Sequence, residues 1–170
     1  MNPKNRPTSS SSSLKPYPLV ETRKGFLFTT DNGSVYEIYL GDGSEFFPGV
    51  SLAPLSVYFG FSRKIKPPKG VALSDQRIET TIKTALFELL EAEPDLIVVF
   101  NYSSMGGKQI GRSELFKQWF SKEQSGYVMQ NYSLQSPNGS ATMIGVILRA
   151  DHFAIPFIAD SIRDYAAGKV

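Results

Sequence analysis

The amino-acid sequence predicts an α+β fold, in which a mainly antiparallel sheet of five to six strands carries three helices in the order βββ-α-β-α-ββ-α. Two turn signals and one change of hydrophobic period lead to this prediction. Asn32-Gly33 and Asn138-Gly139 each lie between two β-rich runs. Asn-Gly favours a hairpin there because both residues tolerate positive φ. Between the two hairpins the apolar spacing changes from two residues to the 3.6 of a helix.

The first half of the chain contains three expected strands. Residues 26–30 and 35–40 flank Asp31-Asn32-Gly33-Ser34 and should pair antiparallel. A third strand is expected at 55–61, where alternate apolar side chains share one face. That face holds Val57, Phe59 and Phe61. The cationic segment 63–69 contains two prolines and should be a loop.

A helix is expected from about Leu73, with Ser74 as its N-cap, and it should end at Pro94. The next run, 96–100, is apolar without alternation, which is typical of a strand covered on both faces. A helix followed by a strand at this spacing fits a crossover connection.

Three further segments complete the expected order. A second helix should cover roughly 109–122, followed by a hairpin of strands at 127–134 and 143–149. The last helix should begin near Pro156 and end at Gly168.

The chain divides into a tail and a single domain. Residues 1–24 are rich in Ser, Pro and basic residues, and such a composition cannot offset its ordering entropy, so we expect a disordered basic tail. Residues 25–170 are expected to form one α+β domain. Neither a signal peptide nor an apolar run long enough to span a bilayer is present, so we expect a cytoplasmic protein that does not enter a membrane.

Composition excludes several kinds of site. The 170 residues include no cysteine and one histidine, which excludes disulfides, thiolate zinc sites, cysteine nucleophiles and histidine clusters. We therefore expect no metal, no cofactor and no catalytic residues, and these absences favour a protein that is not an enzyme. A net charge of +2 is too small to attract nucleic acid by itself. Any basic surface must be local.

The most informative segment is the expected helix after Gly106-Gly107. Helical projection places Arg112 inside an aromatic stripe that includes Trp119, with Lys108 near the same face. In one interpretation Arg112 is a structural residue that pairs with a carboxylate such as Asp75 or Asp95. In the other, Gly106, Gly107, Lys108 and Arg112 bind an anion or a partner at the helix N-terminus.

Three other groups are candidates. Asp75 and Arg77 at the start of the first helix should be a dipole-complementing acid and a surface base, or else an ion pair with Arg112. His152 has no His or Cys partner and should be a capping or partly buried residue rather than a general base. The expected basic patch consists of Arg63, Lys64, Lys66 and Lys69.

The chain resembles a family of small bacterial proteins, mainly of Bacteroidota, that share a domain of unknown function. The shared pattern is Asp75-x-Arg77-Ile78, a short apolar strand, and Gly107-Lys108-x-x-x-Arg112-x-x-x-Phe116-x-x-Trp119-Phe120. The resemblance covers about 26–120 and extends more loosely over the last two strands and helix. It implies relatives but no activity. The family often has Asp-Gly before the basic residue, where this chain has Gly106-Gly107.

Three functions of different kinds are compatible with the sequence, and the third of them is an enzyme on a small substrate, which would need an acid or base from Asp75, Asp151, His152 or Glu114 in one pocket. The first is a non-catalytic interaction or regulatory protein that binds a larger protein partner, for example as an immunity or antitoxin protein, with edge strands adding to the partner's sheet. The second is a binder of nucleic acid or of a phosphorylated ligand, through the basic tail and the basic patch with Lys108 and Arg112.

Overall fold

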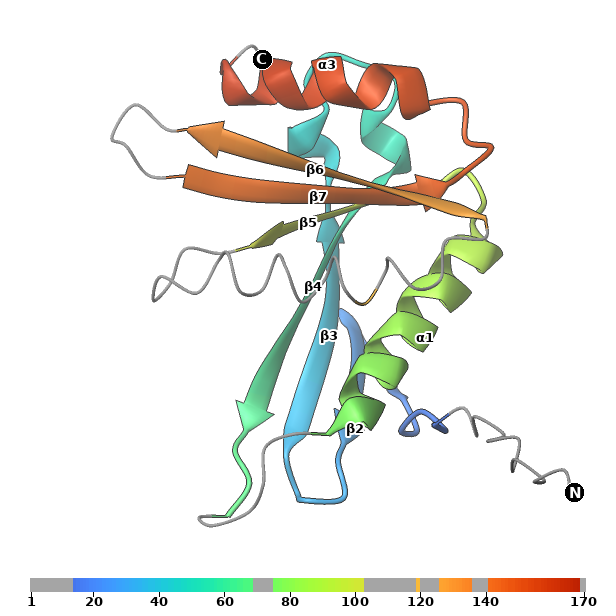
Figure 1. Ribbon diagram of the computed structural model, residues 1–170, viewed down its shortest axis with the longest axis vertical. Helices are drawn as coiled ribbons and strands as arrows, with labels where there is room; N and C mark the ends of the chain where they lie inside the picture. Colours follow the sequence, from blue (N-terminus) through green and yellow to red (C-terminus); the bar gives the residue numbers. More distant parts are fainter. Residues whose placement is uncertain (1–13, 69–74, 103–118, 120–125, 136–140, 169–170) are drawn as a thin grey trace, which may run out of the picture.

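The computed structural model describes residues 14–68, 75–102, 119, 126–135 and 141–168. Within them, one seven-stranded sheet carries two α-helices (Figure 1). The strands are β1 (Val20–Thr22), β2 (Gly25–Thr29), β3 (Val35–Asp42), β4 (Ser56–Ile65), β5 (Ile97–Tyr102), β6 (Tyr127–Gln135) and β7 (Ala141–Arg149). The helices are α1 (Gln76–Ala92) and α3 (Ile155–Ala166), and the turns η1 (Ser44–Phe46) and η2 (Ala53–Leu55) lie between β3 and β4. The predicted α+β class is confirmed.

The strand order is β1-β2-β3-β4-β5-β7-β6. All neighbouring strands are antiparallel except β4 and β5, which are parallel and are connected through α1. Parallel neighbours require such a crossover, so the predicted helix-strand unit is confirmed. Both predicted hairpins are also confirmed. In the first, Gly33 has φ +80° and its N–H donates to the Thr30 carbonyl at 2.9 Å.

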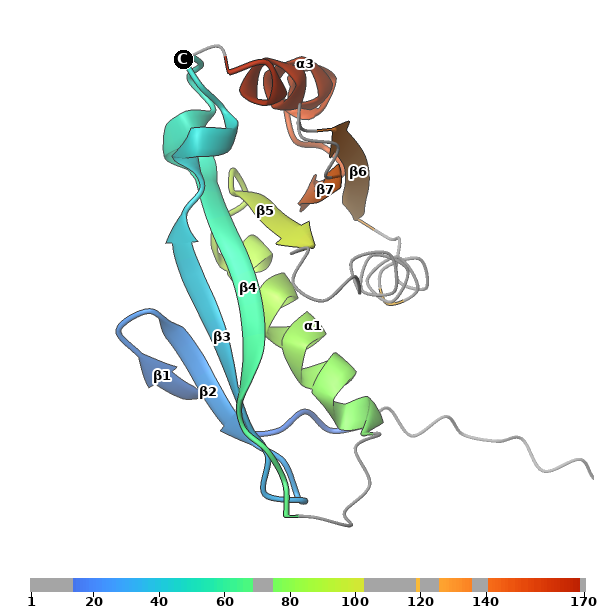
Figure 2. The same ribbon diagram turned by 90° about the vertical axis from the view of Figure 1, so that its left-hand side faces the viewer.

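Helix α1 covers one face of the sheet (Figure 2). The Asp75 side chain caps its N-terminus by accepting a hydrogen bond from the Arg77 backbone N–H at 2.9 Å. The predicted N-cap, Ser74, is therefore wrong by one residue. The helix buries Ile82, Leu86 and Leu90 completely. Their partners include Phe59 of β4, on the strand face that the alternation had predicted.

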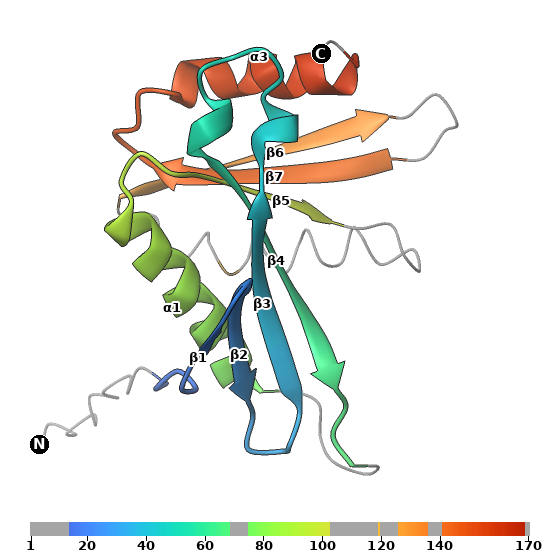
Figure 3. The ribbon, with the colours of Figure 1, turned by 180° about the vertical axis from the view of Figure 1, so that it is seen from behind.

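Helix α3 covers the opposite face at the other end of the sheet, together with η1 and η2 (Figure 3). Ile158 and Ile162 are fully buried there. Strand β5 lies between the two cores, with Val98 and Phe100 in the α1 core and Ile97 and Val99 in the α3 core. All four are at most 3% exposed, which confirms a strand covered on both faces.

The strand count differs from the prediction. The sheet has seven strands instead of five to six, because β1 pairs antiparallel with β2 from Val20 opposite Leu27 to Thr22 opposite Gly25. Three residues carry too short a pattern to be recognised as a strand. The predicted boundary of the tail at residue 24 is corrected as well, since residues 14–24 run alongside the domain and contain the buried Tyr17.

The predicted helix at 109–122 lies outside the described residues, apart from Trp119. The part of the chain that is described therefore contains two of the three expected helices. Neither of these is long and apolar enough to cross a membrane.

Candidate interaction surfaces

Of the residues that the sequence assigned to a possible anion or partner site, Gly106, Gly107, Lys108 and Arg112 lie outside the described residues. Trp119 is described and is only 8% exposed. Its ring stacks on Phe61 with centroids 6.1 Å apart, and its carbonyl accepts a hydrogen bond from Lys83 Nζ at 3.3 Å. Trp119 therefore belongs to the α1 core.

Asp75 takes part in a polar cluster around Tyr17. The Tyr17 hydroxyl donates to Asp75 Oδ2 at 2.6 Å and accepts from the Asp31 backbone N–H at 3.2 Å. The Tyr17 backbone N–H donates to Thr81 Oγ1 at 2.8 Å, and the ring stacks on Phe28 with centroids 6.0 Å apart. We call residues 14–19 the strap, because Tyr17 fastens them to α1 and to the β2–β3 hairpin.

Arg77 closes this cluster from the solvent side. Its guanidinium lies 3.8 Å from the centre of the Tyr17 ring, Nε donates to the Lys15 carbonyl at 3.0 Å, and one terminal nitrogen pairs with Asp31 Oδ2 at 2.7 Å. Asp75 is the predicted dipole-complementing acid. Arg77, predicted as a surface base, instead holds the strap. The alternative pairing with Arg112 lies outside the described residues.

The environment keeps Tyr17 protonated. Burial raises the pKa of Tyr17, and the hydrogen bond to Asp75 raises it further, while the Asp31 N–H and the Arg77 charge lower it. The hydroxyl therefore serves as a donor to Asp75 at neutral pH. The hydrogen bonds of the cluster join the strap to α1 and to the β2–β3 hairpin.

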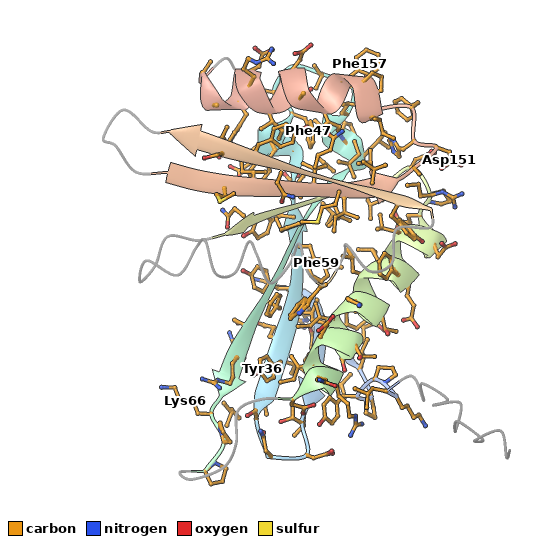
Figure 4. All side chains as sticks on the ribbon, in the orientation of Figure 1. Tyr36, Phe47, Phe59, Lys66, Asp151 and Phe157 are labelled. Atoms are coloured by element: carbon orange, nitrogen blue, oxygen red, sulfur yellow. The ribbon has the colours of Figure 1, made fainter. Side chains whose placement is uncertain are left out.

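The expected basic patch is only partly assembled. Lys64 Nζ pairs with Glu37 Oε2 at 2.9 Å, and Lys69 lies outside the described residues. Arg63 and Lys66 are exposed, and Lys66 extends from the end of β4 (Figure 4). Two exposed cationic side chains beside one lysine that is paired with a carboxylate give only weak support for a nucleic-acid-binding surface.

His152 is a structural residue, as predicted. It is 6% exposed, its Nδ1 accepts from the Ala154 N–H at 3.0 Å, and its Nε2 lies 2.9 Å from the Asp95 carbonyl. Because Nδ1 accepts, the proton lies on Nε2 and donates to Asp95. The imidazole thus joins the start of α3 to the loop before β5, and both of its nitrogens are used in doing so.

Tyr39 and Tyr58 stack on the sheet face away from α1, with ring centroids 6.0 Å apart. Tyr39 lies directly over Gly60, where a Cβ atom would approach its ring to 2.2 Å. The Tyr58 hydroxyl donates to Asn101 Oδ1 at 2.9 Å. Burial, followed by the neighbouring Tyr39, raises the pKa of Tyr58 to about 12. The Tyr58 hydroxyl therefore stays protonated near neutral pH and does not act as a general base there.

The two edges of the described sheet differ in chemistry. Strand β1 has only three residues, with Glu21 at its centre, and it lies between Pro18 and the pair Arg23-Lys24. Short length, charge and proline protect an edge from pairing with other chains. Strand β6 has nine residues, Tyr127–Gln135, and contains no charged residue and no proline. Among the described strands it pairs with β7 alone, so it forms the other edge of the described sheet.

No protein-family model, no curated protein and no solved structure matches this chain. The resemblance to the Bacteroidota domain of unknown function therefore stays a prediction.

Sequence reasoning missed one of these features and left another undecided. Pro16-Tyr17-Pro18-Leu19-Val20 is an apolar run inside the serine- and lysine-rich start, and this local rise in hydrophobicity was the available signal for the strap. The sequence predicted that hairpin strands could form an edge but did not show which, because nothing local indicates that β7, not β6, is the strand adjacent to β5. The hairpin itself was predicted from its turn.

Proposed function

We propose that the protein is a non-catalytic interaction protein of the cytoplasm that binds a larger protein partner by adding a strand of that partner to β6. A single observation carries the proposal: β6 is a nine-residue edge strand without charge or proline. In such pairing the main-chain hydrogen bonds supply affinity, and alternate side chains supply specificity.

The side chains of β6 support a specific contact. Tyr127 and Met129 reach the α1 core, whereas Tyr132 and Leu134 reach the α3 core. Because both faces are fixed by packing, the register of β6 on β7 is defined and its outer groups are held in place. A strand of the partner would therefore pair with backbone groups whose positions are already fixed.

The partner class remains the one expected from the sequence, a larger protein that this chain regulates, in the manner of an immunity or antitoxin protein. Binding of nucleic acid or of a phosphorylated ligand has less support, because Lys64 is already paired with Glu37. Such binding would weaken steeply with salt, whereas strand addition would not.

Two adjacent proline substitutions test the proposal. In an antiparallel pair, neighbouring residues direct their N–H groups to opposite sides. Of Gln130→Pro and Asn131→Pro, one variant therefore loses a backbone bond to β7 and the other loses an outward N–H. Both also lose the contacts of the replaced side chain, which for Gln130 include the hydrogen bond from the Tyr132 hydroxyl. The full-length protein and both variants are used for affinity purification from the native host, with mass spectrometry of what co-purifies.

Of the two variants, we expect the one whose urea unfolding midpoint is unchanged to co-purify no partner. A partner retained by both folded variants, or no partner bound by the unmodified protein, would contradict the proposal. A matched control is Thr22→Pro on the other edge, which should leave capture unchanged.

A further inference from the structure

The strap contacts the domain in the way that a bound peptide contacts its receptor. Side chains of α1 bind two of its main-chain groups. The Tyr17 N–H donates to Thr81 Oγ1 at 2.8 Å, and the Lys15 carbonyl accepts from Arg77 Nε at 3.0 Å. Tyr17 itself is the buried anchor, since it is only 4% exposed. Backbone hydrogen bonds together with a pocket for one side chain are the usual elements of peptide recognition.

Outside this anchor the segment buries little. Leu14 is 44% exposed and Val20 is 63% exposed, so neither of these apolar side chains adds much to the packing. The chain runs past the N-terminal end of α1 into β1, which pairs with β2 as an added strand (Figure 2). Pro16 and Pro18 favour an extended conformation in the residue before each of them, as peptide binding requires. The specificity of this contact therefore comes mainly from one tyrosine.

The polar groups that receive Tyr17 are fixed by bonds that do not involve the strap. Asp75 accepts the phenol at Oδ2, while its Oδ1 accepts the Arg77 N–H at 2.9 Å and caps α1. Arg77 pairs with Asp31 Oδ2 at 2.7 Å, which joins the helix to the β2–β3 hairpin. The Thr81 hydroxyl donates to the Arg77 carbonyl at 2.6 Å, so its oxygen is oriented to accept the Tyr17 N–H.

The apolar wall of the site and its turn are also held independently of the strap. Phe28, on which the tyrosine ring stacks, has Tyr36 on its other side with centroids 5.2 Å apart. The Asp31 N–H that binds the phenol belongs to a turn closed by the Thr30 N–H, which donates to the Ser34 carbonyl at 2.9 Å. We therefore expect the site to keep its shape when the strap leaves it, and a preformed site costs little ordering on binding.

We propose that these groups form a recognition site for extended peptides that carry a tyrosine, and that the strap is its occupant within the chain. The contacts define the ligand. It needs a phenol that donates to Asp75 and accepts from the Asp31 N–H, a free main-chain N–H on the tyrosine, and a ring beside the Arg77 guanidinium. A peptide of another protein would replace the strap through the same bonds. The site lies at the β1 end of the sheet, so the inference does not rest on the function proposed for β6.

Covalent attachment favours the strap over any separate peptide. The strap continues into β1, and only the turn Arg23-Lys24 separates β1 from β2. Such a short connection gives an effective concentration of about millimolar or higher. A separate peptide at micromolar concentration should therefore be excluded from the unmodified protein and should bind once the tyrosine of the strap is removed.

The test supplies the strap as a separate molecule. Full-length Tyr17→Ala, which vacates the site, is titrated with a fluorescein-labelled synthetic peptide of residues 14–24, and binding is followed by fluorescence anisotropy. Two further peptides carry phenylalanine or alanine in place of the tyrosine. Tyr17→Ala combined with Asp75→Asn is the matched control, because asparagine still caps the helix but lacks the charge. Circular dichroism establishes that each variant is folded.

We expect Tyr17→Ala to bind the tyrosine peptide, and to bind the phenylalanine peptide about tenfold and the alanine peptide about a hundredfold more weakly. Adding Asp75→Asn should weaken binding of the tyrosine peptide about fivefold and leave that of the phenylalanine peptide unchanged. A folded Tyr17→Ala variant that binds no peptide, or that binds all three alike, would overturn the inference.

A second measurement needs no variant and decides the matter if Tyr17→Ala does not fold. Isotope-labelled, unmodified full-length protein is mixed with millimolar tyrosine peptide, and amide hydrogen exchange of its own Val20–Thr22 is followed by NMR. Displacement of the strap should release β1 and speed this exchange, whereas the alanine peptide at the same concentration should not. Exchange that is equally fast with the tyrosine peptide, with the alanine peptide and with neither would also overturn the inference.

Discussion

Tyr17 holds the strap to the domain, and two substitutions at this position separate the contribution of its ring from that of its hydroxyl. Tyr17→Phe keeps the stacking on Phe28 and the contact with Arg77 but leaves the Asp75 carboxylate and the Asp31 N–H without the phenol. Hydrogen bonds to a charged acceptor are worth about 1.5–3 kcal/mol, and partial exposure of this pair lowers our expectation to about 1–2 kcal/mol.

Tyr17→Ala removes the ring as well. Tyr17 is 4% exposed. Replacing a buried aromatic residue by alanine costs about 3–5 kcal/mol, and we expect about 3 kcal/mol here because neighbours at the end of a core relax more easily than those at its centre. The loss should also release β1, since its three residue pairs alone are too few to hold it on β2.

The assay is urea unfolding of the full-length protein, followed by the fluorescence of Trp119. This is the only tryptophan of the chain, and it is buried in the same core as Tyr17. Amide hydrogen exchange over Val20–Thr22 reports the release of β1 separately.

Tyr36→Phe is the matched control. Tyr36 also stacks on Phe28, with centroids 5.2 Å apart, and within the described part of the chain its hydroxyl makes no hydrogen bond. This substitution should change stability by less than about 0.5 kcal/mol. If Tyr17→Phe costs no more than Tyr36→Phe, the Asp75 contact does not stabilise the strap. If Tyr17→Ala costs under about 1 kcal/mol and leaves β1 exchange unchanged, the strap is not part of the cooperative fold.

Two further predictions concern the core and the tyrosines. Gly145→Ala should lower the urea midpoint by an equivalent of about 1–3 kcal/mol, because its Cβ would lie 2.3 Å from the ring of Phe100, which is only 3% exposed; an unchanged midpoint would mean that this ring moves aside freely. Burial, with Glu91 beside Tyr127 and with Tyr39 beside Tyr58, raises the pKa of both Tyr58 and Tyr127 to about 12, against 10.0 in the unfolded chain. The stability that these groups contribute is present below pH 10 and is lost as the pH rises through 12, so ultraviolet absorbance should show two tyrosines ionising late and together with unfolding. Ionisation of every tyrosine near pH 10 in the folded protein would contradict this.

Local patterns determined the elements that depend on neighbours in the chain. Asn32-Gly33 predicts the first hairpin because only its own backbone must adopt positive φ. The apolar run 96–100 predicts a strand buried on both faces, and the helical spacing of Ile82 and Leu86 predicts the buried side of α1. His152 was correctly expected to be structural because the chain offers it no His or Cys partner.

Tertiary structure decided what depends on contacts between distant residues. Tyr17 is fixed by Thr81, which is 64 positions away, and by Asp75, which is 58 positions away, so no window around Tyr17 contains the reason for its burial. The order β5-β7-β6 likewise arises from pairing between distant segments, and it is this order that makes β6 an edge. The sequence by itself therefore determined which segments form strands and helices, because φ, ψ and hydrophobic period are local properties. Which strands lie at the edges of the described sheet, and which residues of the start belong to the domain, required the folded chain.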